Sequence, residues 1–199
     1  MNPELRRIFM TISSEVSWLH AVWEIFIQLY GSSDDNVRLM NSVAPQYFAI
    51  TKDVLFDELV LILCRLTDSA KTRSQDNATF AQLIEKLDQD RHDQLIKSLM
   101  ARLEVINNKI GSFRVWRNKR LAHKDLSTAL ENDSLVLPGI TRGDTQEVIN
   151  EMVDFLNEFS IELQGEKQVY NPFLVHHGDG NALMAYLKRV EFALKEREA

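Results

Sequence analysis

A short stretch of the chain, residues 117–125 (RNKRLAHKD), combines three kinds of side chain that carry out acid–base chemistry on phosphates. It holds a permanently charged guanidinium (Arg117), a carboxamide (Asn118) and a titratable imidazole (His123) within about two helical turns. A neutral imidazole takes the proton of a ribose 2′-hydroxyl or protonates the 5′ leaving oxygen, and a guanidinium stabilises the charge that develops around the phosphorus. The stretch therefore predicts RNA cleavage that needs no metal ion.

Further cations in and near this stretch bear on the imidazole and on substrate binding. Lys119, Arg120 and Lys124 disfavour a second positive charge beside them, so we expect His123 to stay largely neutral and to act as a base. Lys119, Lys124 and the earlier Arg114 are expected to bind RNA phosphates.

The spacing of Arg117 and His123 sets a geometric condition on the site. Six residues of a regular helix turn by about 600°, which leaves the two side chains roughly 120° apart and about 9 Å along the axis. A helix bend, the reach of arginine or pairing across a two-fold axis is then needed to build one site. Arg120, three residues before His123, is the alternative cation on the same helix face.

The order of residues in this stretch resembles the signature of the HEPN superfamily, in which an Arg, usually followed by a polar residue, is followed after four to six further residues by a His. Arg117-Asn118 and Leu121-Ala122-His123 carry the resemblance, together with Asp125. It is closest to the AbiU2-like branch linked with abortive infection, because Arg65-Leu66-Thr67-Asp68 and Gly178-Asp179 also fit that branch.

The resemblance implies a helical bundle and a homodimer that brings two motifs together at the interface. In many members it also implies metal-independent endoribonuclease activity, used in phage defence or in toxin–antitoxin systems. The expected partners are RNA, a second copy of the chain, and a cognate antitoxin or a nucleotidyltransferase; no cofactor is expected. The catalytic candidates are Arg117, His123 and Asn118, and the supporting candidates are Arg120, Asp125, Arg65 and Asp68.

Several of these residues have a purely structural alternative. Arg65 and Asp68 have the i, i+3 spacing of a local ion pair at a helix end. Asn118 can cap or bridge backbone groups, and Asp125 can neutralise Lys124. The alternative function is accordingly a non-catalytic helical interaction or nucleotide-binding module in which the Arg/His motif is structural.

The elements that must position this motif are helical, because apolar residues recur every three or four positions and clean alternation is nearly absent. We predict an all-α, single-domain bundle of about six to seven helices over residues 1–199. A loop is expected at 71–78, and 125–143 is long enough to be a functional loop. In the first half of the chain, helices are expected over residues 3–30, from about 34 to 66 with a break at Pro45, and over 79–87. A further helix is expected from 91 to 123 with a bend near 107–112, and another begins at a cap at Asp144. The last helix is expected after Gly180, with Leu183, Leu187, Val190 and Leu194 on its inner side.

Composition narrows the class of protein. The 199 residues are 45% hydrophobic and 26% charged, with only 7 Gly and 4 Pro, which excludes a disordered or collagenous chain. The single cysteine, Cys64, lies in an apolar run and is expected in the core; one cysteine also excludes a paired-cysteine zinc site. His176 and His177 converge poorly with Asp179, so no metal site is expected. No membrane span is expected, and we predict a cytoplasmic protein.

Charge is distributed unevenly along the chain. The formal net charge is −6, which taken alone disfavours a protein that coats nucleic acid. Residues 101–125, however, hold seven Lys or Arg against two Asp or Glu. This basic segment in an acidic chain supports phosphate binding at the motif.

Overall fold

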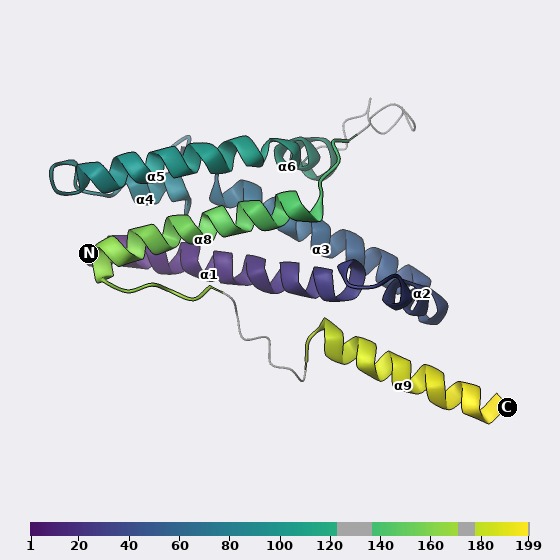
Figure 1. The fold of residues 1–199 in the computed structure, drawn as a ribbon. Helices are drawn as coiled ribbons and strands as arrows, with labels where there is room; N and C mark the ends of the chain where they lie inside the picture. The colour runs from purple at the N-terminus through teal and green to yellow at the C-terminus, as the bar shows by residue number, and fades with distance from the viewer. Residues whose placement is uncertain (123–136, 171–177, 199) are drawn as a thin grey trace. The chain divides into compact units, whose positions relative to one another are not determined.

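The computed structural model of the chain describes residues 1–122, 137–170 and 178–198, and within them it confirms the all-α fold (Figure 1). These residues form eight α-helices, two π-helical segments and one short hairpin. The helices are α1 (Pro3–Phe26), α2 (Asp34–Val43), α3 (Pro45–Leu66), α4 (Phe80–Glu85), α5 (Gln89–Lys109), α6 (Gly111–Trp116), α8 (Arg142–Gln164) and α9 (Gly180–Glu198), the π-helical segments are η1 (Ile27–Gly31) and η2 (Arg117–Ala122), and the strands are β1 (Lys71–Thr72) and β2 (Gln75–Asp76).

Contacts divide the chain into two compact units. Unit 1 contains residues 1–19 and 60–170, and unit 2 contains residues 20–59 and 171–199. Helices α1 and α3 each contribute to both units. We describe each unit by itself, and the single domain expected from the sequence stays a prediction.

The core of unit 1 forms where α1 and α4 pack against α8. Phe9 stacks on Phe159 with ring centroids 5.2 Å apart, and Phe80 meets Phe155 at 4.7 Å. Helix α5 packs along α8 on another side (Figure 1). The side chains that line this core repeat at helical spacing, which is why the apolar periodicity of the sequence located the helices.

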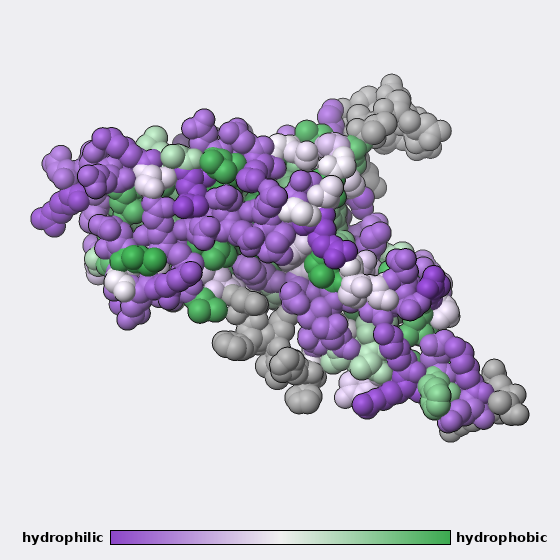
Figure 2. Space-filling model, viewed as in Figure 1, coloured by the Kyte–Doolittle hydropathy of each residue, from purple (hydrophilic) through white to green (hydrophobic). Residues whose placement is uncertain are grey.

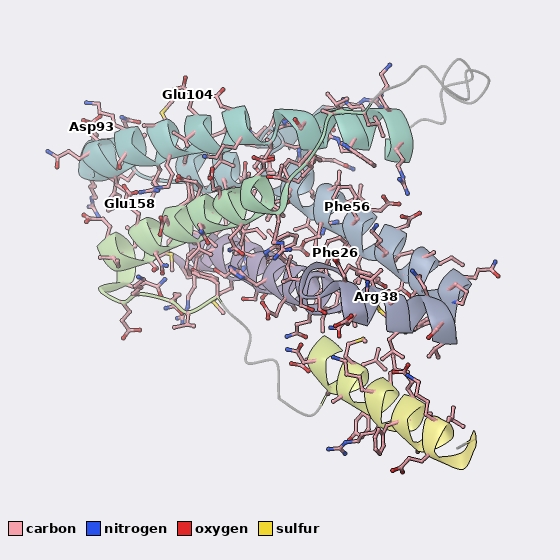
Figure 3. The ribbon with its side chains drawn as sticks, turned by 45° about the vertical axis from the view of Figure 1, so that its right-hand side comes forward. Phe26, Arg38, Phe56, Asp93, Glu104 and Glu158 are labelled. Carbon is pink, nitrogen blue, oxygen red and sulfur yellow. The ribbon has the colours of Figure 1, made fainter. Side chains whose placement is uncertain are left out.

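Unit 2 has a smaller core of its own. Leu29, Leu39, Met40, Phe48 and Met184 are buried together, from η1, α2, α3 and α9. Phe26 of α1 and Phe56 of α3 add an aromatic contact with centroids 6.3 Å apart (Figure 3). The expected inner side of α9 was wrong in part: Leu187 packs on this core, but Leu183, Val190 and Leu194 are exposed, because the helix turns Met184 inward instead.

The Gly178-Asp179-Gly180 turn has a structural use at the start of α9. Asp179 accepts a hydrogen bond from the Ala182 amide at 2.8 Å and another from Gln28 Nε2 at 3.2 Å. A Cβ on Gly180 would lie 3.0 Å from the Gln28 Cβ, so this close approach favours glycine. The sequence match at this turn therefore has a packing cause in unit 2.

Helix boundaries follow local capping chemistry. Ala44 breaks the run between α2 and α3 immediately before Pro45, as expected of a residue that precedes proline. The predicted start of α8 at Asp144 was three residues late, since Thr141 is the N-cap. Thr141 and Asp144 form a reciprocal capping box in which Asp144 occupies the third helical position.

Two predicted loops have different outcomes. Residues 71–78 contain the β1–β2 hairpin, with Lys71 opposite Asp76 and Thr72 opposite Gln75. The long segment 125–143 lies mostly outside the described residues, and α8 begins at its end.

None of the described helices is long and apolar enough to cross a membrane. The face seen in Figure 2 is largely hydrophilic with small separate apolar patches.

Candidate active site

The site is built where α3 ends in unit 1. Helix α3 stops at Leu66, and the next two residues turn out of it. The Thr67 hydroxyl donates to the Leu63 carbonyl at 2.8 Å, which fixes this last turn. Asp68 follows, and its side chain is 38% exposed, so the turn presents a carboxylate at the edge of the core.

Arg117, the arginine of the motif, binds this carboxylate. Its Nη1 donates to both oxygens of Asp68, at 2.9 Å each. Its Nε donates to Asn118 Oδ1 at 3.3 Å. The Arg117 side chain is only 24% exposed, and among the described residues no acceptor is bound to its Nη2. Arg117 is thus held in place by Asp68 and Asn118.

A second guanidinium shares the same carboxylate. Arg114 Nη1 donates to Asp68 Oδ1 at 3.0 Å, and Arg114 Nη2 donates to the Thr67 carbonyl at 2.8 Å and to Asn107 Oδ1 at 3.1 Å. Two permanent positive charges therefore meet one carboxylate. Counted over the part of the chain that the structure describes, this leaves a surplus of one positive charge, which favours an anion.

The backbone changes its winding at the motif. Helix α5 ends at Lys109, Ile110 leaves regular helical geometry, and α6 runs over six residues before it passes into the π-helical segment η2. η2 spans Arg117–Ala122, which is the whole interval between the motif arginine and the residue before His123. π-Helical turns are rare and occur often at functional sites.

A buried cysteine is close enough to the two guanidiniums and to Asp68 for their charges to act on its thiol. Cys64 of α3 is fully buried and unpaired, as expected from its apolar run. Burial raises the pKa of its thiol, an effect that the charges of Arg117 and Arg114 oppose and that of Asp68 reinforces. Cys64 is thus a buried core residue of α3 near the charged groups of the site.

Comparison with protein families gives one match over most of the chain. The AbiU2 family model of the HEPN group, described as AbiU2, matches residues 2–183. The chain belongs to this family. Comparisons with curated proteins and with solved structures gave no match. The resemblance stated from residues 117–125, 65–68 and 178–179 is confirmed at the level of the family.

The remaining motif residues of this AbiU2 chain are only partly within the structure. His123, Lys124 and Asp125 lie outside the described residues, so their predicted roles rest on the sequence. Lys119 is exposed. The Arg120 guanidinium lies over the Trp116 ring, 5.5 Å from its centroid, and thus has an aromatic partner next to the motif.

The two supporting candidates near the end of α3, Arg65 and Asp68, have different ion-pair partners. The predicted local pair of Arg65 with Asp68 does not form, because Arg65 reaches across to an ion pair with Glu15 of α1. Asp68 instead faces Arg114 and Arg117. The i, i+3 spacing fails as a guide here because Asp68 comes after the helix has ended.

The basic segment 101–125 is partly neutralised by α8. Arg102 Nη1 donates to Glu151 at 3.0 Å and its Nε donates to Glu158 at 3.1 Å, with Asp154 at 3.8 Å. Figure 3 shows Glu158 on the side of α8 that faces α5. Lys109 likewise binds Glu147 at 2.7 Å. Helix α8 thus neutralises the part of the basic segment before Arg114.

Two contacts of the site were not anticipated from sequence. Asn107 lies where the sequence predicts only a bend, yet its side chain accepts a hydrogen bond from Arg114. Trp116 Nε1 donates to the Pro138 carbonyl at 2.9 Å, which ties α6 to the segment before α8. Neither pairing has a local spacing signal, because each joins residues whose contact depends on the fold. Among the described residues, no cluster of three His, Cys, Asp or Glu side chains is placed to hold a metal ion.

Proposed function

We propose that this AbiU2 protein is a metal-independent endoribonuclease. The observation that carries the proposal is the pair Arg114 and Arg117 on the single carboxylate of Asp68, at the start of the π-helical segment that leads into His123. A fixed guanidinium with spare donors is suited to bind a phosphodiester and to stabilise its pentacoordinate transition state.

The proposed reaction divides the chemistry between two residues. The 2′-hydroxyl attacks the adjacent phosphorus, and His123 takes its proton. The bond from phosphorus to the 5′ oxygen breaks, the 5′ oxygen takes a proton from solvent, and His123 later returns its proton to solvent, so that the products are a 2′,3′-cyclic phosphate and a 5′-hydroxyl. Arg117 stabilises the charge on the non-bridging oxygens, and Asn118 positions Arg117 through its hydrogen bond to Nε.

The proposal includes a homodimer in which two motifs share one cleft. It is supported by the family, and a two-fold axis would bring a second copy of Arg117 and of His123 to the same place. The biological setting that the family suggests is abortive infection, with a toxin–antitoxin pair as its other form.

The decisive experiment is incubation of total RNA with the wild type and with His123→Ala in EDTA, followed by identification of the 3′ ends. We expect the wild type to produce 2′,3′-cyclic phosphates, and His123→Ala to lose about 10²–10⁴-fold in rate, the usual contribution of proton transfer. Intact RNA with folded wild-type protein at every pH would refute the proposal, as would full-rate cleavage by His123→Ala.

The division of each site between subunits has a separate test. His123→Ala and Arg117→Ala are each expected to be inactive alone. Mixed and allowed to exchange subunits, they form heterodimers that hold one intact Arg and one intact His across the cleft. Restored cleavage would support a shared cleft, and continued inactivity of verified heterodimers would contradict it.

A second function is favoured by a specific observation. The Asp68–Arg117 and Asp68–Arg114 ion pairs join the end of α3 to α6 and η2, which is also what a purely structural motif would do. A non-catalytic helical interaction module is therefore the alternative. The two differ in Arg117→Lys, which keeps an ion pair with Asp68 and hence the fold, but lacks the planar fork that catalysis requires.

A further inference from the structure

Helix α9 of unit 2 makes few packing contacts in its own chain. Met184 is buried in the core of unit 2 and Leu187 packs against that core in part. From Lys188 to Glu196, a stretch that the structure describes throughout, no side chain is buried. Isolated helices shorter than about 12–15 residues are marginal in water, since most helical stability comes from packing of an apolar face. The second half of α9 therefore needs a surface to pack on.

The unpacked part of α9 carries an apolar stripe. Its members recur at intervals of four, three and four residues, which is the spacing of a helix–helix seam. The stripe lies about 100° around the helix from Met184, so α9 can present it while Met184 stays in the core. The α9 stripe consists of Leu183, Leu187, Val190 and Leu194, with Tyr186 beside them, and all but the partly buried Leu187 are 40–63% exposed.

Helix α3 carries a second exposed apolar stripe in the same unit. The α3 stripe consists of Tyr47, Ile50 and Val54, at intervals of three and four residues, and these side chains are 57–64% exposed. Phe48, one position from Tyr47, is buried in the core of unit 2. The α3 stripe is therefore displaced by about 100° from the core side of its helix, as the α9 stripe is on α9.

The two stripes do not cover each other within one chain, because both are exposed. The start of α9 is also fixed in place. Asp179 accepts a hydrogen bond from Gln28 Nε2 at 3.2 Å, and the Asn181 amide donates to Gln28 Oε1 at 3.3 Å. Gly180 packs closely against the same side chain. Helix α9 is thus held by its first turn, and its stripe is left for another molecule.

The exposed area is close to what a stable dimer needs. A large side chain has on the order of 200 Å² when fully exposed, so the exposed members of the two stripes together present on the order of 800 Å². Standard protein–protein interfaces bury about 800 Å² on each partner. Exposed apolar surface of this extent marks an interaction site in soluble proteins.

Charge indicates which helices pair. Residues 45–61 of α3 hold one Lys against three Asp or Glu, whereas residues 183–195 of α9 hold three Lys or Arg against one Glu. The two segments therefore have opposite net charges. Opposite charges favour an α3–α9 contact, and like charges disfavour contact of α3 with α3 or of α9 with α9. One chain thus carries both complementary surfaces of a seam.

We propose that the α9 stripe of one copy packs on the α3 stripe of a second copy, and the reverse. Such an exchange is isologous, so a two-fold axis closes it into a dimer with two α3–α9 seams. The dimer buries on the order of 1,600 Å² in total, the standard size of a specific interface. The seams lie in unit 2, away from Arg117, and they do not depend on RNA cleavage.

The first test is the mass of the purified protein by sedimentation equilibrium. The wild type should be a dimer. Ile50→Asp and Val190→Asp should each raise the dimer dissociation constant at least tenfold, because each places a carboxylate in an apolar seam. Met100→Asp is the matched control: Met100 lies on α5 and is 57% exposed, like Ile50, and its loss should leave the constant unchanged. A monomeric wild type, or equal effects of Met100→Asp and Ile50→Asp, would overturn the proposal.

Mixing the two variants tests which helices pair. A heterodimer of Ile50→Asp with Val190→Asp has one seam in which both stripes are wild type, and it has both aspartates in the other seam. The mixture should therefore dimerise at least tenfold more tightly than either variant alone. If α9 paired with α9 instead, Ile50→Asp would dimerise like the wild type and the mixture would show no recovery. Either of these results would overturn the proposal.

Two further measurements keep folding and cleavage apart from assembly. Both substituted side chains are exposed in the single chain, so each variant should keep a cooperative unfolding transition by circular dichroism. RNA cleavage by a wild-type dimer whose dissociation constant neither variant changes would overturn this inference alone. Recovery on mixing, with RNA left intact by the wild type, would support the seams and count against the proposed function.

Discussion

Two arginine clusters in unit 1 have opposite ratios of charge. At Arg102, one guanidinium of α5 meets three carboxylates of α8, from Glu151, Asp154 and Glu158. At Asp68, one carboxylate meets two guanidiniums, from Arg114 and Arg117. The first cluster is rich in acceptors and the second in donors. On the proposed function only the second would bind an anionic substrate, although both arginine clusters belong to the same basic segment of the sequence.

Helix geometry produces this difference. The three acids on α8 are three and four residues apart, so they lie along one helix face and converge on Arg102. Burial of Arg102 works against its charge, yet the hydrogen bond to Glu158 and the charges of the acids raise its pKa. Asp68, in contrast, follows the end of α3, where no further turn of the helix supplies a second acid. Within the described residues, Arg102 is surrounded by acids and joins two helices, whereas Arg114 and Arg117 share one carboxylate.

The largest expected effect is on catalysis at the donor-rich cluster. Arg117→Ala should lower the rate of RNA cleavage by about 10²–10³-fold, as for loss of one group that stabilises transition-state charge. Arg117→Lys should recover little, because an ammonium lacks the planar fork. Single-turnover cleavage of a defined RNA measures both.

The matched control for this prediction is Arg102→Ala. Arg102 has a similar side-chain exposure to Arg117, 30% against 24%, but is bound by acids on α8. We expect its cleavage rate to stay close to that of the wild type once folded protein is compared. Equal losses in the two variants would show that the comparison between the clusters has no bearing on function.

Asp68→Asn tests the balance of charge itself. Removal of the carboxylate leaves Arg114 and Arg117 less well positioned, so we expect the cleavage rate to fall about tenfold, in line with loss of a supporting contact around a catalytic group. The same change adds one net positive charge, so RNA binding should tighten. The slope of log K against log salt should steepen by about 0.7 for single-stranded RNA.

Glu15→Gln provides a control of equal charge change for Asp68→Asn. Glu15 is 35% exposed and pairs with Arg65 in the same unit, but it does not contact the motif. Its cleavage rate should therefore be unchanged. A Glu15→Gln variant that reproduces the fall in rate would mean that general electrostatics, and not the position of Arg117, governs the activity.

The same contrast explains how far the sequence could predict the molecule. The helices, the break at Pro45 and the burial of Cys64 depend on local periodicity and short-range chemistry, and these were predicted. The family followed from the order of residues around Arg117. Pairings over long sequence separations, such as Asp68 with Arg117, require the packed fold, and residue spacing favoured the local partner Arg65 instead.

The start of α8 was predicted wrongly because two nearby residues can each cap the helix. Thr141 and Asp144 are both good N-cap residues, and the sequence offers no way to prefer one. The structure takes Thr141 because Asp144 can then return a hydrogen bond from the third helical position. The inner side of α9 was missed for a related reason, since apolar residues occur on more than one face of that helix and only packing selects Met184.

At the acceptor-rich cluster the expected effect is on stability. Arg102→Met leaves Glu151, Asp154 and Glu158 without their cation, and we expect a loss of about 1–2 kcal/mol in the free energy of unfolding at pH 7, between the values for exposed and buried pairs. The loss should shrink as the pH is lowered and the acids take up protons. Urea denaturation at pH 7 and pH 4 measures it.

The control for Arg102→Met is Arg38→Met. Arg38 pairs with Asp35 on α2, and both side chains are about three-quarters exposed, so its loss should have little effect at either pH. If Arg102→Met lowers the free energy of unfolding as little as Arg38→Met, the ion pairs of Arg102 with the three acids do not stabilise the fold. The proposed contrast between the Arg102 cluster and the Asp68 cluster would then be wrong.

The smallest expected effect concerns the start of α8, the helix that supplies the three acids. Hydrogen bonds from the Thr141 backbone and side chain lower the pKa of Asp144 below its usual value of 3.8. Because the pKa is lower in the folded state, the ionised carboxylate stabilises the fold at pH values above the unfolded pKa. That contribution is lost as the pH falls through the folded pKa. Asp144→Asn should therefore flatten the acid limb of a plot of Tm against pH below about pH 4, whereas Asp90→Asn, at an exposed position in α5, should leave the limb unchanged. RNA cleavage at neutral pH should be unaffected by either variant, since the acceptor-rich side of unit 1 serves the fold; a cleavage defect in Asp144→Asn that Asp90→Asn lacks would instead couple α8 to the donor-rich site.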